Sequence, residues 1–178
     1  MTDAFATISL VPQPLSLGLR AVPLAPMSVA LSLLVRRVIR GHPGLLERLG
    51  EYSGRRFVVD PTDLPLCLLI QPNAARDVVR LYRQPPPADA RIAGPLAALL
   101  GLVHGTWDGD ALFFSRDLVI EGDTSAALAL RNAIDDAELD LGTEISALAG
   151  PFGQMLRPII AFAEHQTGMP LRRMEEPR

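Results

Sequence analysis

Two hydrophobic periods alternate along the chain and predict both helices and strands. Apolar residues recur every three to four positions in some stretches, which is the spacing of one helix face. This spacing predicts helices at 27–40, 45–49, 96–103, 124–134 and, kinked at Pro158, 152–168. Short runs of β-branched or aliphatic residues are typical of strands instead. They predict strands at 57–59, 66–70, 78–82, 88–93 and 118–120.

The order of these elements favours an α+β fold. Short connections join the early strands, and short connections are typical of antiparallel hairpins. Residues 66–70 are apolar on both faces, which predicts a central or covered strand. We therefore expect a five-stranded, mostly antiparallel sheet covered by helices, with helical extensions at the N-terminal and C-terminal ends.

The chain divides into three parts. Residues 1–26 are apolar but interrupted by four prolines, so we expect an extended arm that cannot span a membrane. Residues 27–168 are expected to form a single domain. The charged residues 169–178 predict a disordered tail.

The most completely specified unit is the stretch from Leu118 to Ile134. A short aliphatic strand ends at Gly122, and Asp123 or Thr124 can cap the helix that follows. The helix has a narrow apolar stripe of mostly small side chains: Ala126, Ala127, Leu130, Ala133 and Ile134. Such a stripe can pack closely against a sheet.

Composition and charge exclude some classes of function. The net charge is −3, and no Lys is present, so the basic surplus of a nucleic-acid-binding protein is missing. The single cysteine, Cys67, cannot form an internal disulfide, which favours a reducing compartment. The first residues lack the pattern of a secretion signal, so we expect a cytoplasmic protein.

Candidate catalytic and metal-binding residues do not form a constellation. Cys67 lies in the most apolar predicted strand, and His42, His104 and His165 belong to separate elements. The densest carboxylate cluster comprises Asp108, Asp110, Asp117, Glu121 and Asp123, and Phe113 and Phe114 interrupt any calcium-loop frame within it. Loop and cap roles explain this cluster. We therefore expect a protein that is not an enzyme and has no cofactor or metal.

Three arginines crowd the end of the helix at 27–40. Arg36, Arg37 and Arg40 complement the negative end of the helix dipole. The alternative is that they meet lipid headgroups or an anionic membrane surface, because an apolar helix with a basic end is typical of peripheral membrane contact. The sequence leaves both interpretations open.

Several apolar faces have to share one sheet. If the apolar faces of the helices and the sheet leave a gap between them, the gap is a lipid site. If these faces pack tightly, they form an ordinary hydrophobic core. A lipid site would be lined by Leu68, Leu96, Leu99, Leu100, Val103, Phe113, Phe114, Met155, Leu156, Ile159 and Ile160. Each methylene taken out of water contributes about 0.8 kcal/mol, so such a site needs no polar motif.

Several segments resemble the sterol-carrier-protein type of lipid-binding domain. The most specific is the stretch from Phe113 to Thr124, which contains Phe-Phe and the run Leu-Val-Ile-Glu-Gly-Asp-Thr. Residues 23–26, 88–90 and 159–164 are similar to other blocks of that superfamily, in the same order. Within it the chain is most similar to ubiquinone biosynthesis accessory factors of the UbiT type. The segment 135–153 departs from their pattern.

The resemblance implies a non-catalytic carrier of polyprenylated ubiquinone precursors or phospholipid. It further implies that partner hydroxylases, the iron–sulfur proteins UbiU and UbiV, carry out the chemistry without oxygen. Two alternatives stay open from the residues: an assembly module whose apolar arm docks a partner protein, and a generic sterol or phospholipid carrier with no role in quinone synthesis.

Overall fold

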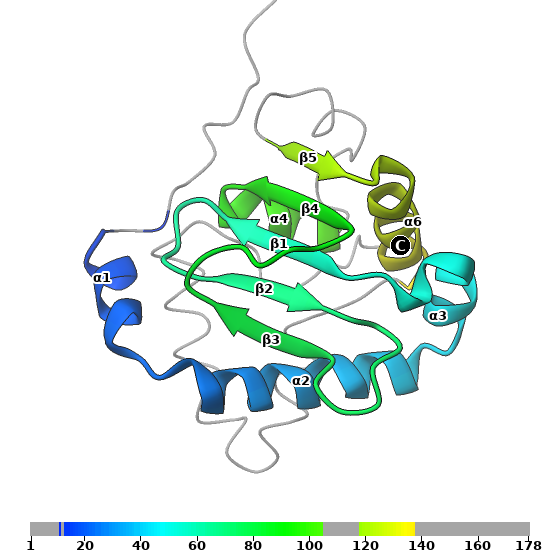
Figure 1. Cartoon of the computed structure of the whole chain (residues 1–178), viewed down its shortest axis with the longest axis horizontal. Helices are drawn as coiled ribbons and strands as arrows, with labels where there is room; N and C mark the ends of the chain where they lie inside the picture. The colour runs from blue at the N-terminus through cyan, green and yellow to red at the C-terminus, as the bar shows by residue number, and fades with distance from the viewer. Residues whose placement is uncertain (1–10, 12, 105–117, 138–178) are drawn as a thin grey trace, which may run out of the picture.

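The computed structural model describes residues 11, 13–104 and 118–137, arranged as a sheet with helices around it (Figure 1). The helices are α1 (Gln13–Ala21), α2 (Leu24–Gly41), α3 (Gly44–Leu49), the 3-10 helix η1 (Gly50–Gly54), α4 (Leu96–His104) and α6 (Thr124–Asp136). The strands are β1 (Phe57–Pro61), β2 (Cys67–Ile70), β3 (Val79–Tyr82), β4 (Ala90–Gly94) and β5 (Val119–Gly122).

The strands form one sheet in the order β3-β2-β1-β4-β5. Three of the neighbouring pairs are antiparallel, and the central pair β1–β4 is parallel. This confirms the predicted mostly antiparallel α+β fold. It also confirms that residues 67–70 form an interior strand, because β2 lies between β1 and β3.

The parallel pair requires a connection that crosses the sheet. Residues 83–89, which include the run Pro85-Pro86-Pro87, lead from the end of β3 past β2 and β1 to the start of β4 (Figure 1). Proline cannot donate to a sheet ladder, so this segment runs over the sheet without joining it. Ala88 packs there against the cluster of Val58, Cys67 and Leu69.

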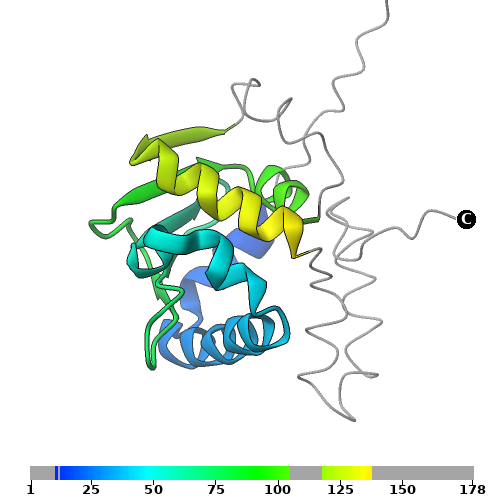
Figure 2. The same cartoon turned by 90° about the vertical axis from the view of Figure 1, so that its right-hand side faces the viewer.

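The main core lies on the opposite face of the sheet, beneath α3, α4 and α6. Figure 2 shows α6 running across this side of the molecule. The most deeply buried members of this core are Leu49, Phe57, Ala98, Ala126, Ala127 and Ala133, each with at most 1% of its surface exposed. The predicted small-residue stripe of α6 is therefore confirmed as the side that packs inward.

Helix α1 corrects the expectation of an extended arm. Residues 13–21 are helical, and Pro14 lies in the first turn, where its missing N–H has no intrahelical role. At the other end, the Arg83 guanidinium donates to the carbonyls of Leu19, Arg20 and Val22 at distances of 2.8–3.0 Å. A cation from a distant loop thus satisfies the free carbonyls at the end of α1, which local sequence could not predict. Residues 1–10 lie outside the described part.

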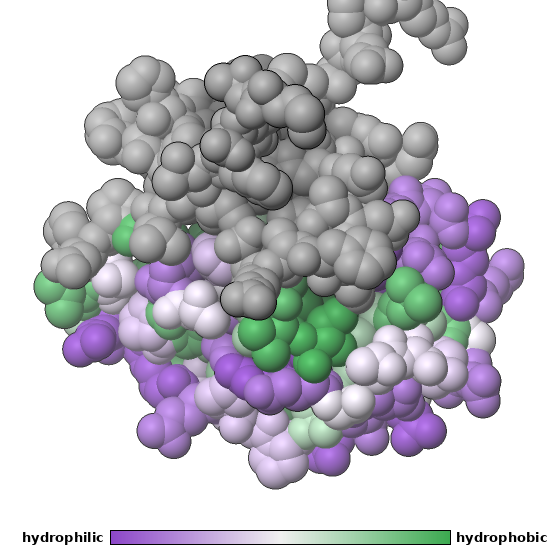
Figure 3. Space-filling view, turned by 90° about the horizontal axis from the view of Figure 1, so that it is seen from above, coloured by the Kyte–Doolittle hydropathy of each residue, from purple (hydrophilic) through white to green (hydrophobic). Residues whose placement is uncertain are grey.

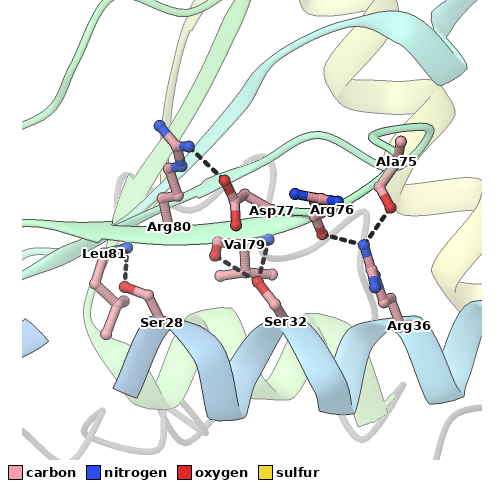
Figure 4. Close-up of polar contacts among 9 residues, drawn as sticks. All are labelled: Ser28, Ser32, Arg36, Ala75, Arg76, Asp77, Val79, Arg80 and Leu81. Atoms are coloured by element: carbon pink, nitrogen blue, oxygen red, sulfur yellow. Dashed lines mark hydrogen bonds and ion pairs between the residues drawn. The ribbon is translucent and has the colours of Figure 1, made fainter. Parts of the chain in front are cut away.

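Helix α2 seals the edge of the sheet at β3 (Figure 4). The buried Ser32 hydroxyl donates to the carbonyl of Val79 (2.6 Å) and accepts from the N–H of the same residue (3.0 Å). One helical turn earlier, the Ser28 hydroxyl accepts from the N–H of Leu81 at 2.9 Å. One turn later, Arg36 donates to the carbonyls of Ala75 and Arg76.

The spacing explains why these contacts fit. Four residues of helix advance about 6 Å and two residues of strand advance about 6.8 Å, so every fourth helical side chain meets every second strand residue. An unpaired strand edge is a site for unwanted pairing, and polar side chains satisfy it here. Sequence reasoning missed this role, although the signal was present as Ser28, Ser32 and Arg36 at four-residue intervals.

The strand–turn–helix unit at 118–136 forms as predicted. The Asp123 carboxylate accepts from the N–H of Ala126 at 3.0 Å, so Asp123 is the N-cap of α6. Gly122 has φ +82°, and a Cβ added there would lie 2.4 Å from the carbonyl oxygen of Asp89. Glycine is thus required at this position for two reasons: the positive φ and the close approach of the Asp89 carbonyl oxygen.

Candidate functional site

The predicted apolar site is only partly within the described residues. Leu68 lies on β2, and Leu96, Leu99 and Leu100 lie on α4. Val103 belongs to α4, but its side chain is outside the described part. Also outside it are Phe113, Phe114, Met155, Leu156, Ile159 and Ile160. For these residues the lipid-site assignment stays a prediction.

Helix α4 divides its leucines between two clusters. Leu99 is 7% exposed and belongs to the main core with Ala98. Leu96 and Leu100 instead pack on a second cluster built around Val11 and Ala97. The structure brings Leu96 and Leu100 together and places Leu99 on the sheet side of the helix.

Asp63 holds this second cluster in position. One carboxylate oxygen accepts from the N–H of Leu96 (2.9 Å), at the start of α4, and the other accepts from the N–H of Val11 (3.0 Å). A carboxylate beside the first turn of a helix also interacts favourably with its dipole. One side chain therefore fixes both α4 and the N-terminal segment against the domain.

The helix-side face of β1 and β2 is incompletely covered. Val59 and Leu68 are register partners there, and Ile70 is the partner of Phe57 on the same face. All three are partly exposed, although both strands lie inside the sheet. On the opposite face of the same strands, Val58, Cys67 and Leu69 are at most 7% exposed.

Helix α2 carries further apolar side chains on the side of the helix that includes Val38. Val38 is buried in the main core, and Val59 and Ile70 pack against that core from the sheet. Leu31, Leu34 and Val35 precede Val38 by seven, four and three residues and are partly exposed. Those intervals place them on the helix side of Val38. We name these six partly exposed residues, Val59, Leu68, Ile70, Leu31, Leu34 and Val35, the apolar strip.

Two hollows lie elsewhere on the described surface. A groove of about 650 Å³ runs between the proline-rich connection and the strands β4 and β5, lined by Gln84, Pro85, Pro86, Pro87, Ala88, Arg91, Glu121 and Gly122. A smaller hollow of about 420 Å³ lies on α2 and is lined by Leu33, Arg36, Arg37 and Arg40.

The cation in the larger groove is already neutralised. Arg91 donates from Nε to Asp60 (3.0 Å) and from Nη1 to Glu121 (2.6 Å). The hydrogen bond with Asp60, followed by that with Glu121, raises the pKa of Arg91. Two carboxylates on one guanidinium leave no net positive charge for an anionic ligand. In the predicted carboxylate cluster, Glu121 and Asp123 therefore have structural roles, and Asp108, Asp110 and Asp117 lie outside the described residues.

Candidate catalytic groups remain dispersed in the described part. His42 ends α2, where its Nδ1 lies 3.0 Å from the carbonyl oxygen of Val38. His165 and the side chain of His104 lie outside the described residues. Among residues 11, 13–104 and 118–137, no group of His, Cys, Asp and Glu could hold a metal ion, and no helix is long and apolar enough to cross a membrane.

Cys67 is expected to be unreactive in the folded protein. Its side chain is 1% exposed, and burial, with the Asp60 carboxylate acting in the same direction and Arg91 opposing, raises the pKa of the thiol to about 11. At pH 8 we expect labelling by a thiol reagent at least about 100-fold slower than in urea, because the thiolate is the reacting form. Rapid labelling of the native protein would contradict this.

The same shift has a consequence for stability. In the unfolded chain Cys67 ionises near its ordinary pKa of 9.0, whereas in the folded protein it stays protonated up to about 11. The unfolded state therefore binds fewer protons in that window, and stability falls as pH rises from 9 to 11. Urea titrations of the wild type and Cys67→Ala should show a smaller loss in the variant.

Comparison with known proteins identifies the domain type. The sequence pattern of the SCP-2 sterol transfer family matches residues 35–135. No curated protein sequence matches the chain at the level expected of a relative.

One solved structure shares the fold at low sequence identity, and a second is similar at a lower score. A protein described as "UbiJ-SCP2 Ubiquinone synthesis protein" has a TM-score of 0.52 and 19% identity, covering 66% of this chain and 96% of its own. Sterol Carrier Protein 2 from Yarrowia lipolytica, in its apo form, has a TM-score of 0.45 and 15% identity, covering 63% of this chain and 92% of its own.

Proposed function

Because the chain belongs to the SCP-2 sterol transfer family, we propose that it is a non-catalytic lipid carrier. The observation that carries this proposal is the apolar strip. The side of a sheet that helices cover normally forms a closed core, yet Val59, Leu68 and Ile70 are partly exposed on that side. A lipid chain lying on the strip would cover them.

The energetics favour such an occupant. Removing apolar surface from water contributes about 25 cal/mol per Å², or about 0.8 kcal/mol for each methylene of the lipid. An isoprenoid or acyl chain can therefore bind firmly without a polar contact. The strip borders the main core through Val38, so the bound chain would extend an existing apolar interior.

The lipid we propose is a polyprenylated intermediate of ubiquinone synthesis. Support comes from the resemblance of the stretch from Phe113 to Thr124 to UbiT-type accessory factors, and from a structural neighbour described as a ubiquinone synthesis protein. In this proposal, partner hydroxylases of the UbiU and UbiV type act on the held intermediate in the cytoplasm. A phospholipid is the alternative lipid, and it would make the protein a generic carrier.

Organic extraction tests both levels of the proposal. Purified protein should release a lipid, identified by mass spectrometry, and Leu68→Gln should release several-fold less. Leu128→Gln is the matched control, because Leu128 is 45% exposed on α6 and lies outside the strip. A phospholipid in place of a prenylated quinone precursor would contradict the quinone role. A wild type that holds no lipid and takes up none would contradict lipid carriage itself.

The assembly alternative depends on the N-terminal segment. Arg83 binds the end of α1, and Asp63 binds Val11, so this segment is attached to its own domain at two points. Leu17 on α1 nonetheless remains 58% exposed. If a partner protein docked there, Leu17→Ser would abolish the complex while leaving the extracted lipid unchanged.

A further inference from the structure

The N-terminal segment lies outside the part of the chain that the family pattern matches. The pattern covers residues 35–135, whereas Val11, α1 and Val22 precede it. We name Val11 together with residues 13–22 the strap. Among its described side chains, none belongs to the main core or to the apolar strip. The strap is therefore an addition to the family domain, and its contacts on that domain indicate its role.

One loop anchors both ends of the strap. Residues 62–66 connect β1 with β2, and Figure 1 shows α1 beside this end of the sheet. Within the loop, the Asp63 carboxylate accepts from the N–H of Val11 at 3.0 Å. The Arg83 guanidinium, which donates to three carbonyls at the end of α1, also donates to the carbonyl of Pro65 in the loop at 3.2 Å. These anchors are polar and few, so the strap can detach without unfolding the main core.

The strap covers leucines that the sequence assigns to the lipid site. Val11 is 7% exposed, and it packs with Ala97, Leu64, Leu96 and Leu100 in the second cluster. Leu96 and Leu100 belong to the predicted lipid site, and both are partly exposed. Val11 therefore takes the place on α4 that an apolar ligand would occupy.

The second cluster lies at one end of the apolar strip. Val59 and Leu68 are register partners, and they are the strip residues closest in the chain to the loop that joins β1 to β2. Leu64 belongs to that loop and packs in the second cluster with Leu96 and Leu100. A lipid chain that lies on the strip and runs toward this loop therefore reaches Leu64, where it meets the strap.

Resting on the proposed lipid-carrier function, we propose that the strap is an autoinhibitory gate on the lipid site. In the closed arrangement Val11 covers the leucines of α4, and a lipid chain displaces it. Asp63 links the gate to the site, because its other carboxylate oxygen accepts from the N–H of Leu96 at 2.9 Å, at the start of α4. This contact persists when the strap leaves, so α4 stays in position while the site opens.

Hydrogen exchange of the full chain measures the opening of the strap. Arg83→Ala removes the anchor at α1 and leaves both contacts of Asp63 intact. The amides of α1 should then exchange at least about 10-fold faster, because a hydrogen bond to a charged group contributes roughly that factor or more. The amides of β1 and α4 should keep their wild-type rates. Unchanged exchange in α1 would contradict the anchoring role of Arg83.

Arg80→Ala is the matched control for the loss of one arginine. Arg80 lies on β3 and pairs with Asp77, which precedes that strand, whereas Arg83 follows it. Arg80→Ala should therefore leave the exchange of α1 at the wild-type rate.

Binding of cis-parinaric acid, a fluorescent fatty acid, tests the gate itself. A ligand that binds only the open form has its apparent affinity reduced by the fraction of protein that is open. Arg83→Ala should therefore bind the probe more tightly, by up to the factor seen in exchange and through faster association. Val11→Ser should also tighten binding, because it weakens the cover and keeps both backbone anchors. By reciprocity, saturating probe should speed the exchange of α1 in the wild type.

The outcomes separate the gate from the carrier function. Unchanged or weaker probe binding in Arg83→Ala and Val11→Ser would overturn the gate, and so would an equal gain in Arg80→Ala. The carrier function would survive each of these results, since the probe still binds. If neither the wild type nor any variant binds the probe, and extraction recovers no lipid, the carrier function fails and the gate fails with it.

Discussion

Gly122→Ala is expected to destabilise the protein by about 3 kcal/mol or more. A backbone conformation with φ +82° is strained for any residue with a Cβ, and the added methyl would meet the carbonyl oxygen of Asp89 at 2.4 Å. That carbonyl cannot easily retreat, because it accepts from the N–H of Asp123 at 2.8 Å. The Asp89 carboxylate is also held by the N–H of Arg56 at 2.7 Å. Urea denaturation measures the change.

Variants at two other glycines separate the effect of backbone strain from the effect of the close contact. Gly50 has φ +49°, but a Cβ added there meets nothing within 4 Å, so Gly50→Ala reports conformational strain alone, about 1–3 kcal/mol. Gly54 has neither feature, and Gly54→Ala should be nearly neutral. If Gly122→Ala cost no more than Gly50→Ala, the close contact with Asp89 would be unimportant.

Ser32→Ala is expected to cost about 2–3 kcal/mol. The substitution leaves the N–H of Val79 without its partner in a buried position and removes the hydrogen bond to the carbonyl of the same residue. A strand edge with unsatisfied backbone groups also becomes a template for pairing between molecules. Thermal unfolding measures the stability, and light scattering at partial denaturation should show faster aggregation.

Ser28→Ala provides the comparison for that variant. Ser28 makes the analogous contact with Leu81, but it is only partly buried, so water can replace the lost partner and the cost should be about 1 kcal/mol. Equal losses for the two variants would mean that burial of Ser32 does not govern the contribution. Ser32→Thr should keep the hydroxyl and recover part of the stability.

Local patterns predicted most of the elements correctly. Changes in the spacing of apolar residues predicted all five described strands. The run Gly122-Asp123 predicted the boundary between β5 and α6. These features depend on residues within a few positions of one another. Backbone permissiveness, side-chain capping and alternation of apolar residues determine them locally.

Features that depend on contacts between residues far apart in the chain could not be predicted from local sequence. The helix at 13–21 is completed by Arg83, and the sealed edge needs α2 beside β3. The parallel pairing of β1 with β4 was not anticipated, because nothing in either strand specifies its neighbour. For the candidate site, the apolar pattern predicted that Leu68 and the leucines of α4 line one lipid site. In the structure, Leu99 packs in the main core, whereas Leu96 and Leu100 pack in a second cluster.

The parallel central pair has a consequence for how the chain folds. β1, β2 and β3 form successive hairpins between segments that are close in the sequence. By contrast, the pairing of Phe57 with Ala90 joins residues that are separated by both hairpins. Closing a long loop costs conformational entropy before any contact compensates for it. The parallel β1–β4 pair should therefore form after the hairpins. The run Pro85-Pro86-Pro87 stiffens the closing segment and reduces that entropy. Replacing it with flexible residues should therefore slow refolding more than it speeds unfolding.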